Sequence, residues 1–243
     1  MRDDRHTTPL PRKYTIAGIR QETPSVTRYV LDGALDAGPG QFVMAWLPGI
    51  DEKPFSLMAA SPVTLAVAGV GPFTEALAQR KVGDSLWLRG PFGNGFTIRG
   101  ERLLLVAGGY GAAPLAYLAR AAMDAGKSVS VVIAAREKEL LLLTDYFRDL
   151  GCQVWTCTDD GSDGRCMLAD EAADCALDAR PADGIYACGP EPMLDAIERL
   201  ARERGLPAQL SREAYMRCGI GVCGSCTCGD RLVCLDGPVF EVE

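Results

Sequence analysis

The sequence predicts an antiparallel β-barrel, then an α/β domain with a parallel sheet, and finally a short cysteine-rich region. Three observations predict this order. Short β-rich runs separated by turn residues occupy residues 10–98, and an apolar strand then opens a strand–helix–strand pattern over residues 99–210. Five of the ten cysteines fall in residues 211–243. The chain has 243 residues, a length typical of one large domain or two modest ones.

Composition limits the classes of function. The 25 Lys and Arg residues against 32 Asp and Glu residues give a net charge of −7, which argues against nucleic acid or an anionic membrane as the main partner. A hydrophobic fraction of 48% is ample for a packed core and excludes wholesale disorder. His6 is the single histidine and lies in a polar stretch, so His-based triads and His-ligated zinc are excluded unless His6 is recruited.

Cysteine usage indicates a metal rather than disulfides. The first residues contain no apolar signal segment, and no run approaches the ~20 apolar residues that cross a bilayer, so we expect a cytoplasmic chain with reduced thiols. Crowding of cysteines near the C-terminus favours metal ligation. The scattered cysteines are expected to be buried structural thiols; these are Cys152, Cys157, Cys166 and Cys175.

The barrel is predicted from five strand-like runs divided by Gly, Pro and Asp residues, a spacing typical of a small antiparallel barrel or sandwich. The runs are KYTIAGIRQ, VTRYVLDG, QFVMAWLP, VTLAVAGV and DSLWLRG. Between the third and fourth lies KPFSLMAA, at residues 53–60. Its basic residue, aromatic ring and hydroxyl could hold a phosphate and flank a flavin ring, but taken alone it reads as an ordinary strand.

The α/β domain begins with RLLLVAGG, a continuous apolar run typical of a strand buried on both faces of a parallel sheet. The helix APLAYLARAAMDAG, which ends at Gly126, and the strand SVSVVIAA complete a βαβ unit. The pattern continues through the strands CQVWTCT and GIYACG and the helix EPMLDAIERLARERG. We therefore expect a Rossmann-like, doubly wound domain.

Two loops of this domain carry glycines at the end of a strand. GGYGAAPL, at residues 108–115, joins a strand to a helix, where glycines let a dinucleotide pyrophosphate approach the backbone. Its pattern is G-G-x-G-x-x-P rather than G-x-G-x-x-G, so a plain tight turn stays open as an alternative. YACGPEPML, at residues 186–194, ends a second strand in the same manner. Two such loops favour a ligand crevice.

The cysteine tail carries the most specific pattern. Cys218, Cys223 and Cys226 form C-x4-C-x2-C, and Cys234 follows after seven further residues. This is the plant-type spacing for a [2Fe–2S] cluster. We favour Cys234 as the fourth ligand and Cys228 as a spare thiol, because cysteines separated by one residue reach the same cluster edge with difficulty. A zinc knuckle with four cysteine ligands is the alternative, but its second short cysteine pair is missing.

The combination resembles the electron-transfer subunits of NAD-dependent (class 1B) dihydroorotate dehydrogenases, a branch of the ferredoxin–NAD(P) reductase superfamily. The resemblance covers about residues 11–243 and is most specific in YMRCGIGVCGSCTCGDRLVCLDGPVF. It implies an FAD-binding barrel over 10–98, an NAD-binding domain over 99–210 and a [2Fe–2S] region over 211–243. The implied cluster ligands are Cys218, Cys223, Cys226 and Cys234.

The resemblance also implies cofactor contacts. Phe55 would lie near the flavin ring and Ser56 near its N5 edge. Lys53 stands where the family commonly has Arg, and lysine cannot make the bidentate phosphate contact of arginine. The implied FAD residues are Lys53, Pro54, Phe55, Ser56, Gly71 and Thr74, and the implied NAD residues are Gly108, Gly109, Gly111, Cys188, Gly189 and Pro190. Asp159 and Asp160 would repel a 2′-phosphate and favour NAD over NADP, with two solvated turn aspartates as the alternative.

The resemblance implies an electron relay. A catalytic partner with FMN would oxidise dihydroorotate in pyrimidine biosynthesis, the cluster would carry electrons singly to FAD, and FAD would pass a hydride to NAD+. Such a chain needs no acid–base residue of its own. We expect a heterotetramer of two copies of each chain, with the partner covering an apolar face around residues 216–240.

Two alternatives remain at this point. The small subunit of a ferredoxin–NADP reductase or sulfide dehydrogenase complex shares this domain order and a similar cysteine tail. The seven residues before Cys234 and the ending DGPVF favour the dihydroorotate dehydrogenase family. A non-catalytic regulatory module that binds zinc is the alternative from another class, and it would be colourless because zinc is d10.

Overall fold

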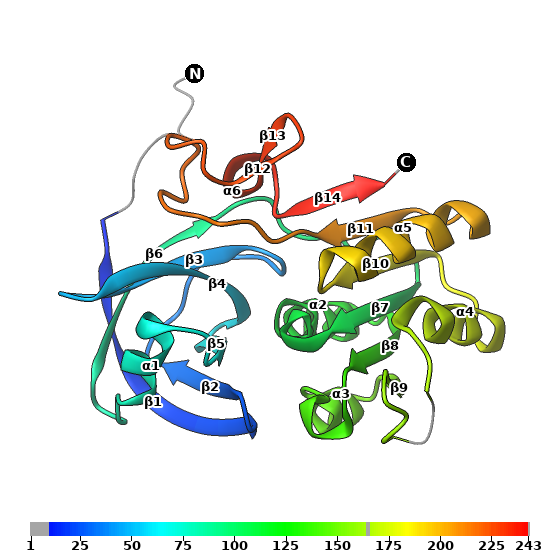
Figure 1. Cartoon of the computed structure of the whole chain (residues 1–243), viewed down its shortest axis with the longest axis horizontal. Coiled ribbons are helices and arrows are strands. Elements are labelled where there is room, and N and C mark those ends of the chain that lie inside the picture. The colour runs from blue at the N-terminus through cyan, green and yellow to red at the C-terminus, as the bar shows by residue number, and fades with distance from the viewer. Residues whose placement is uncertain (1–9, 164–165, 243) are drawn as a thin grey trace.

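A computed structural model of the chain describes residues 10–163 and 166–242, so His6 lies outside the described residues. The first half forms a closed antiparallel barrel in the strand order β1-β2-β5-β4-β3-β6, on the left of Figure 1. Its strands are β1 (Arg12–Thr23), β2 (Val26–Leu31), β3 (Phe42–Leu47), β4 (Asp51–Ala60), β5 (Val63–Ala68) and β6 (Ser85–Phe92). The fold class predicted for this half is confirmed.

Alternate side chains along a barrel strand face opposite sides of the barrel wall. On β3, Val43, Ala45 and Leu47 point into the barrel core, as the period of two along a strand requires. Phe42 and Met44 point outward, yet both are buried, because the C-terminal region packs against them. The short helix α1 (Pro72–Ala78) adds side chains to the barrel core. One barrel strand therefore supports both the barrel core and the cysteine region.

The second half forms a six-stranded sheet in the order β14-β11-β10-β7-β8-β9. The strands from β11 to β9 are parallel to one another, and β14 joins the edge antiparallel to β11. Its strands are β7 (Arg102–Gly108), β8 (Ser128–Ala135), β9 (Gln153–Thr158), β10 (Gly184–Cys188), β11 (Ala208–Ser211) and β14 (Val239–Val242). This confirms the predicted parallel-sheet domain.

Helices cover both faces of this sheet, as alternate side chains of β7 require. Leu103 and Leu105 face α2 and α3, whereas Leu104 and Val106 face α4 and α5. The helices are α2 (Ala112–Asp124), α3 (Thr144–Asp149), α4 (Ala169–Ala179) and α5 (Glu191–Arg204), with short 3-10 turns η2 (Gly109–Gly111) and η3 (Lys138–Leu140). Within the described ranges, no helix has the length and apolarity needed to span a bilayer.

The C-terminal region leaves the sheet after β11, crosses the outer face of the barrel and returns (Figure 1). It contains β12 (Thr227–Cys228), β13 (Arg231–Leu232) and α6 (Val233–Asp236) before β14 adds the edge strand. The chain therefore links the barrel, the cysteine loop and the sheet in one packed unit. The predicted boundaries at 98/99 and 210/211 stay predictions.

The expectation for the scattered cysteines is half wrong. Cys152 and Cys157 are buried, and burial raises the pKa of each thiol to about 11. Cys166 and Cys175 are exposed instead. Cys175 lies on α4, whose packed stripe against the sheet is formed by alanines and a leucine. Cys166 forms an isolated bridge with Thr158, next to the exposed residues Asp159 and Asp160. All ten cysteines lie in the described residues and are unpaired.

Candidate functional site

A cavity of about 660 Å³ lies between the barrel and the sheet. Its lining comes from β4, the start of α1, the loop after β7, the end of β10 and the segment 211–216. A concave, mostly apolar space with a few polar groups is typical of a cofactor site. The cavity brings together seven of the residues implied by the resemblance: Lys53, Pro54, Phe55, Ser56, Gly71, Thr74 and Cys188.

The β4 segment contributes an aromatic ring and a hydroxyl group to the cavity wall. The ring of Phe55 lies 5.7 Å from that of Phe73 on α1, and both rings line the cavity. Ser56 also faces the cavity and pairs in register with Phe42 of β3. Tilted aromatic rings beside a small polar group suit one face and one edge of a planar heteroaromatic ring.

Lys53 lines the cavity and forms an ion pair with a neighbouring carboxylate. Its ammonium group is 2.6 Å from the carboxylate of Asp51 and 6.0 Å from the ring centroid of Tyr215. The hydrogen bond from Lys53 is the main reason why the pKa of Asp51 lies below its usual value. A lysine that already has a carboxylate partner offers a phosphate less charge than a free arginine would.

Gly71 and Thr74 have different roles. The Thr74 hydroxyl accepts hydrogen bonds from the N–H groups of Val70 at 2.9 Å and Gly71 at 3.0 Å, and donates to the Gly71 carbonyl at 2.8 Å. These three hydrogen bonds stabilise the turn before α1 and use the hydrogen-bonding capacity of the Thr74 hydroxyl. Gly71 has extended backbone with φ 171°, and a β-carbon there would meet no atom within 4 Å. The space beside Gly71 is open for a ligand that approaches the backbone.

The two glycine loops leave neighbouring strands at the point where the strand order reverses. β7 pairs with β10 on one side and with β8 on the other, so the chain builds the sheet outward in both directions from β7. Ligands of open α/β sheets bind at the carboxyl ends of strands at such a switch point. Residues 108–111 and 188–190 leave β7 and β10 there, as the sequence predicted for a ligand crevice.

Three of the four predicted glycines in these loops are required by contact between the loops. A β-carbon at Gly111 would lie 2.1 Å from the Cys188 carbonyl oxygen. One at Gly108 would lie 2.8 Å from Cδ of Pro190, and one at Gly189 would lie 3.0 Å from Cα of Gly108. Gly109 differs, with φ 54° and no atom within 4 Å of such a carbon. Gly109 is therefore the glycine that leaves room for a ligand.

Not all of the predicted nucleotide residues line the cavity. Tyr110, from the same loop as the glycines, and Cys188 form part of the wall. The residues that lie outside the lining are Gly108, Gly109, Gly111, Gly189 and Pro190. Burial raises the pKa of the Cys188 thiol to about 12, so the thiol stays protonated and neutral. A neutral thiol can contact a ring face but does not act as a nucleophile.

The loop after β9 holds the two predicted specificity aspartates. The Asp160 carboxylate accepts hydrogen bonds from the hydroxyl of Ser162 at 2.6 Å and from its N–H at 2.9 Å, which lowers the pKa of Asp160. Its side chain thus closes its own turn. The Cys166 thiol donates to the Asp159 carbonyl at 3.1 Å and holds the other end of the loop.

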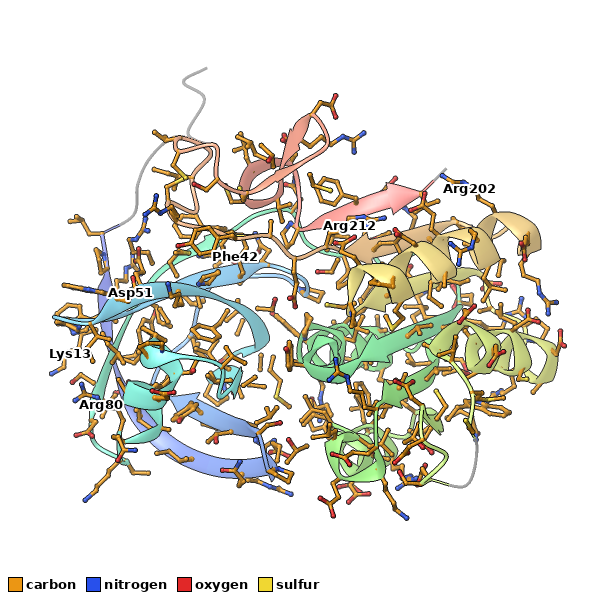
Figure 2. All side chains as sticks on the ribbon, viewed as in Figure 1. Lys13, Phe42, Asp51, Arg80, Arg202 and Arg212 are labelled. Atoms are coloured by element: carbon orange, nitrogen blue, oxygen red, sulfur yellow. The ribbon has the colours of Figure 1, made fainter. Side chains whose placement is uncertain are left out.

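Several lining residues were not singled out by the sequence. They are Phe42, Tyr110, Arg212, Glu213 and Met216. Arg212 forms ion pairs with Glu191, Asp195 and Glu198 of α5, and Figure 2 shows it beside that helix. Most of these residues follow β11, a four-residue strand too short to be recognised. If β11 had been recognised as a parallel strand, the residues after its carboxyl end would have been predicted to lie at the ligand site.

The cysteine loop is wrapped so that backbone N–H groups point at sulfur. Ile220 donates to Cys218 Sγ at 3.4 Å, Gly221 donates to Cys234 Sγ at 3.2 Å, and Cys234 donates to Cys226 Sγ at 3.4 Å. Such hydrogen bonds stabilise thiolates and the sulfur atoms of a bound cluster. The tight turns use left-handed backbone at three glycines, with φ between 69° and 74°: Gly219, Gly221 and Gly224.

The four predicted ligands are arranged as two interacting pairs. Contacts with Ser225 and then with Cys218 lower the pKa of the exposed Cys223 thiol to about 6. Burial and the neighbouring Cys226 raise the pKa of Cys234 to about 12. Within residues 10–163 and 166–242, no group of three or more His, Cys, Asp or Glu side chains converges on one point suited to a single ion. Four cysteines in this loop match the ligand set of a [2Fe–2S] cluster.

Known protein families match both the cysteine region and the parallel-sheet domain of this chain. The family described as the iron-sulfur cluster binding domain of dihydroorotate dehydrogenase B matches residues 213–243, and the oxidoreductase NAD-binding domain matches residues 105–199. A chain of the NADH-dependent reduced ferredoxin-NADP oxidoreductase structure has a TM-score of 0.80 with 28% identity, over 94% of this chain and 87% of that chain. A ferredoxin reductase from carbazole 1,9a-dioxygenase has a TM-score of 0.68 with 25% identity, over 81% of this chain and 66% of that chain.

Fold and site together define an NAD-binding oxidoreductase with a flavin-reductase barrel and an iron–sulfur region. A probable dihydroorotate dehydrogenase B (NAD(+)) electron transfer subunit from Thermococcus kodakarensis is 44% identical over 96% of this chain and 97% of its own length. One from Methanocaldococcus jannaschii is 42% identical over 93% of this chain and 87% of its own length. The chain belongs to the family of dihydroorotate dehydrogenase B electron transfer subunits.

Proposed function

We propose that this chain carries electrons from an FMN-containing dihydroorotate dehydrogenase catalytic subunit to NAD+ in de novo pyrimidine (UMP) biosynthesis. The observation that supports this most directly is the position of the cavity, which is shared by the flavin-type barrel and the nucleotide-type sheet and adjoins the cysteine loop. A chain with these three parts in contact needs only a partner that supplies electrons.

The flavin and nucleotide would be held by separate parts of the cavity. When bound, FAD supplies the exchange between hydride transfer to NAD+ and single-electron transfer with the cluster. Phe55 would cover one face of the flavin ring, Ser56 would hydrogen-bond its edge, and Gly71 would admit its nucleotide portion. Gly109 would leave room for NAD, with the buried, neutral Cys188 thiol in the cavity wall.

The cluster would be held by the four cysteines of the C-x4-C-x2-C…C pattern. The N–H groups directed at sulfur would compensate the negative charge of the thiolates. Cys228 lies in β12 and takes no part in these N–H···S contacts, which supports its assignment as a spare thiol. The proposed ligands are Cys218, Cys223, Cys226 and Cys234.

We assign the preference for NAD to Asp159 rather than to Asp160. The Asp160 carboxylate is committed to Ser162. Asp159 starts the same loop, beyond the carboxyl end of β9, where its carboxylate would repel a 2′-phosphate. Replacement of Asp159 by Ser should therefore raise the affinity for NADPH more than replacement of Asp160 does.

The proposed partner surface surrounds the cysteine loop. Val222 is 74% exposed and Tyr215 66% exposed, and the Cys223 thiol in the same loop is exposed as well. Large exposed apolar side chains beside a redox centre suit a covering chain. We propose a heterotetramer of two copies of each chain, located in the cytoplasm.

Native co-purification through an N-terminal tag, followed by mass spectrometry, tests the partner. We expect an FMN-containing dihydroorotate dehydrogenase chain. The Cys223→Ser variant should lose the cluster and the flow of electrons from the partner, but should still oxidise NADH with an artificial acceptor. The matched Cys228→Ser variant should keep the cluster. Partner-to-NAD electron transfer retained in Cys223→Ser would contradict the relay.

A second candidate is supported by one structural observation. The TM-score of 0.80 to the NADH-dependent reduced ferredoxin-NADP oxidoreductase chain makes the small subunit of a ferredoxin-linked complex a reasonable alternative. Recovery of a large flavoprotein related to glutamate synthase in the same co-purification would favour it. The cofactor assignments would then stand and the substrate would change.

A further inference from the structure

The cavity and the cysteine loop share one layer of side chains. Phe42 and Met216 line the cavity. The same two side chains belong to the apolar cluster that contains Cys226 and Cys234. Phe42 is 2% exposed and Met216 8% exposed, so little water reaches either one. We call Phe42 and Met216 the shared layer.

Both residues are fixed from two sides. Phe42 pairs in register with Ser56 at the cavity, while its ring packs 5.7 Å from that of Phe92. Phe92 in turn faces Gly219, where a β-carbon would lie 3.5 Å from its ring. Figure 2 shows Phe42 between the barrel strands and the C-terminal segment. The Phe42 side chain therefore reaches from the flavin-type pocket toward the cysteine loop.

Met216 makes the second connection. It precedes Cys218 by two residues, and the segment that ends at Met216 lines the cavity from Ser211 onward. A single stretch of backbone thus runs from the cavity wall into the cysteine loop. Both the packed side chain and the covalent chain bring the two sites close together, and both side chains of the layer are buried.

On these grounds we infer that Phe42 and Met216 are positioning residues that set the electronic coupling between the cluster and the flavin. This inference rests on the proposed function. Electron transfer slows steeply with distance and slows further across a void, so a close-packed layer favours it. Each crossing moves one electron and changes no bond in either side chain. Two electrons that cross from the cluster, together with one proton from solvent, would make up the hydride that is passed to NAD+.

Met44 provides a matched control. It lies on the same strand as Phe42, is fully buried and belongs to the same apolar cluster, but it does not line the cavity. Truncation of Met44 and of Met216 to alanine removes the same atoms from the same cluster. Met44 packs against the cysteine loop, where a β-carbon on Gly219 would lie 3.0 Å from its Cγ, so Met44→Ala opens a void on the loop side alone. Met216→Ala opens a void in the layer that also borders the cavity.

The test mixes NADH with the full chain carrying FAD and cluster, without oxygen, and follows flavin bleaching and cluster reduction separately. In Met216→Ala the ratio of the cluster rate to the flavin rate should fall about tenfold, because a void without partner atoms replaces packed side-chain atoms between the two sites. Met44→Ala should leave this ratio unchanged, and Met216→Leu should restore it. The electron paramagnetic resonance spectrum and the midpoint potential of the cluster should match those of the wild type.

Three outcomes would overturn the inference. They are an unchanged ratio in Met216→Ala, an equal fall in Met44→Ala, or a shift in cluster potential large enough to explain the slower rate. A wild-type chain that takes up neither FAD nor a cluster, or whose flavin is not bleached by NADH, would instead overturn the proposed function itself.

Discussion

Gly111 packs so closely against Cys188 that a β-carbon on Gly111 would lie 2.1 Å from the Cys188 carbonyl oxygen. This contact joins the loops that leave β7 and β10 at the switch point of the sheet. The clash is with backbone, so no side-chain rotation relieves it. The loops keep their spacing only while residue 111 has no side chain.

Gly111→Ala should therefore force the two loops apart. We expect a loss of about 1–3 kcal/mol in the free energy of unfolding, the usual cost of overpacking, together with weaker NADH binding. Urea unfolding and NADH titration measure the two effects. Gly184→Ala in β10 is the control, because a β-carbon there meets its nearest neighbour at an ordinary 3.4 Å. Equal stability of the two variants would contradict the role of this contact.

Gly71→Ala should weaken flavin binding while leaving the stability of the apoprotein almost unchanged. The backbone of Gly71 is extended and the space beside it is open, so alanine costs the apoprotein little. If the FAD nucleotide occupies that space, the added methyl group should lower flavin content at a fixed FAD concentration. Flavin absorbance per chain, compared with the thermal midpoint of the apoprotein, gives the answer. Undiminished flavin content would place the nucleotide elsewhere.

The main elements could be predicted because their signals are local. β7 and β8 are continuous apolar runs bounded by polar or glycine residues, and the cysteine spacing lies within one short loop. β14 gave no comparable signal, because four residues do not indicate which strand they join. Its pairing of Phe240 with Leu210 depends on the path of the whole C-terminal region.

The candidate site was harder to predict, because the environment of a side chain depends on distant segments. Phe42 is typical of a barrel strand in sequence, yet its outer side is covered by the cysteine region. Thr74 matched a motif in which its hydroxyl contacts a cofactor, but local hydrogen bonds already occupy that hydroxyl. Gly108 and Gly111 matched a phosphate-binding pattern, and contacts between the loops account for these two glycines as well.

Asp183 should contribute to stability in a pH-dependent manner. Its carboxylate accepts hydrogen bonds from the Arg102 side chain and from the N–H groups of Glu101 and Arg102, and these hold its pKa well below the usual range. A carboxyl whose pKa is lowered by folding stabilises the fold above its unfolded pKa of about 3.9. That contribution is lost as the pH falls from there through the folded pKa.

Asp183→Asn should therefore lower the thermal midpoint at pH 7, and the difference from wild type should narrow as the pH falls below about 4. Thermal unfolding from pH 7 to pH 3 measures it. Asp145→Asn is the control, since Asp145 pairs with Arg148 at a site where its side chain is 88% exposed and such pairs contribute little. A constant difference across this pH range would show that charge is not the cause.

Arg89 links the barrel to the cysteine loop. Its guanidinium donates to both carboxylate oxygens of Glu52 at 2.7 and 2.6 Å, and to the Cys218 carbonyl at 3.1 Å. The side chain is only 10% exposed, so water cannot replace these partners easily. Lysine keeps the charge but lacks the planar fork, and cannot satisfy Glu52 and Cys218 together in this geometry.

Arg89→Lys should cost about 1–2 kcal/mol and shorten the lifetime of the bound cluster, because the loop that carries Cys218 loses its attachment to the barrel. Visible absorbance during incubation with an iron chelator follows that lifetime. Arg99→Lys is the matched control: Arg99 also makes a fork with Glu241, but both side chains are about half exposed and the pair does not touch the cysteine loop. It should cost about 0–1 kcal/mol and leave the cluster lifetime unchanged. Equal cluster lifetimes in the two variants would mean that the loop is held by its own turns, without help from the barrel.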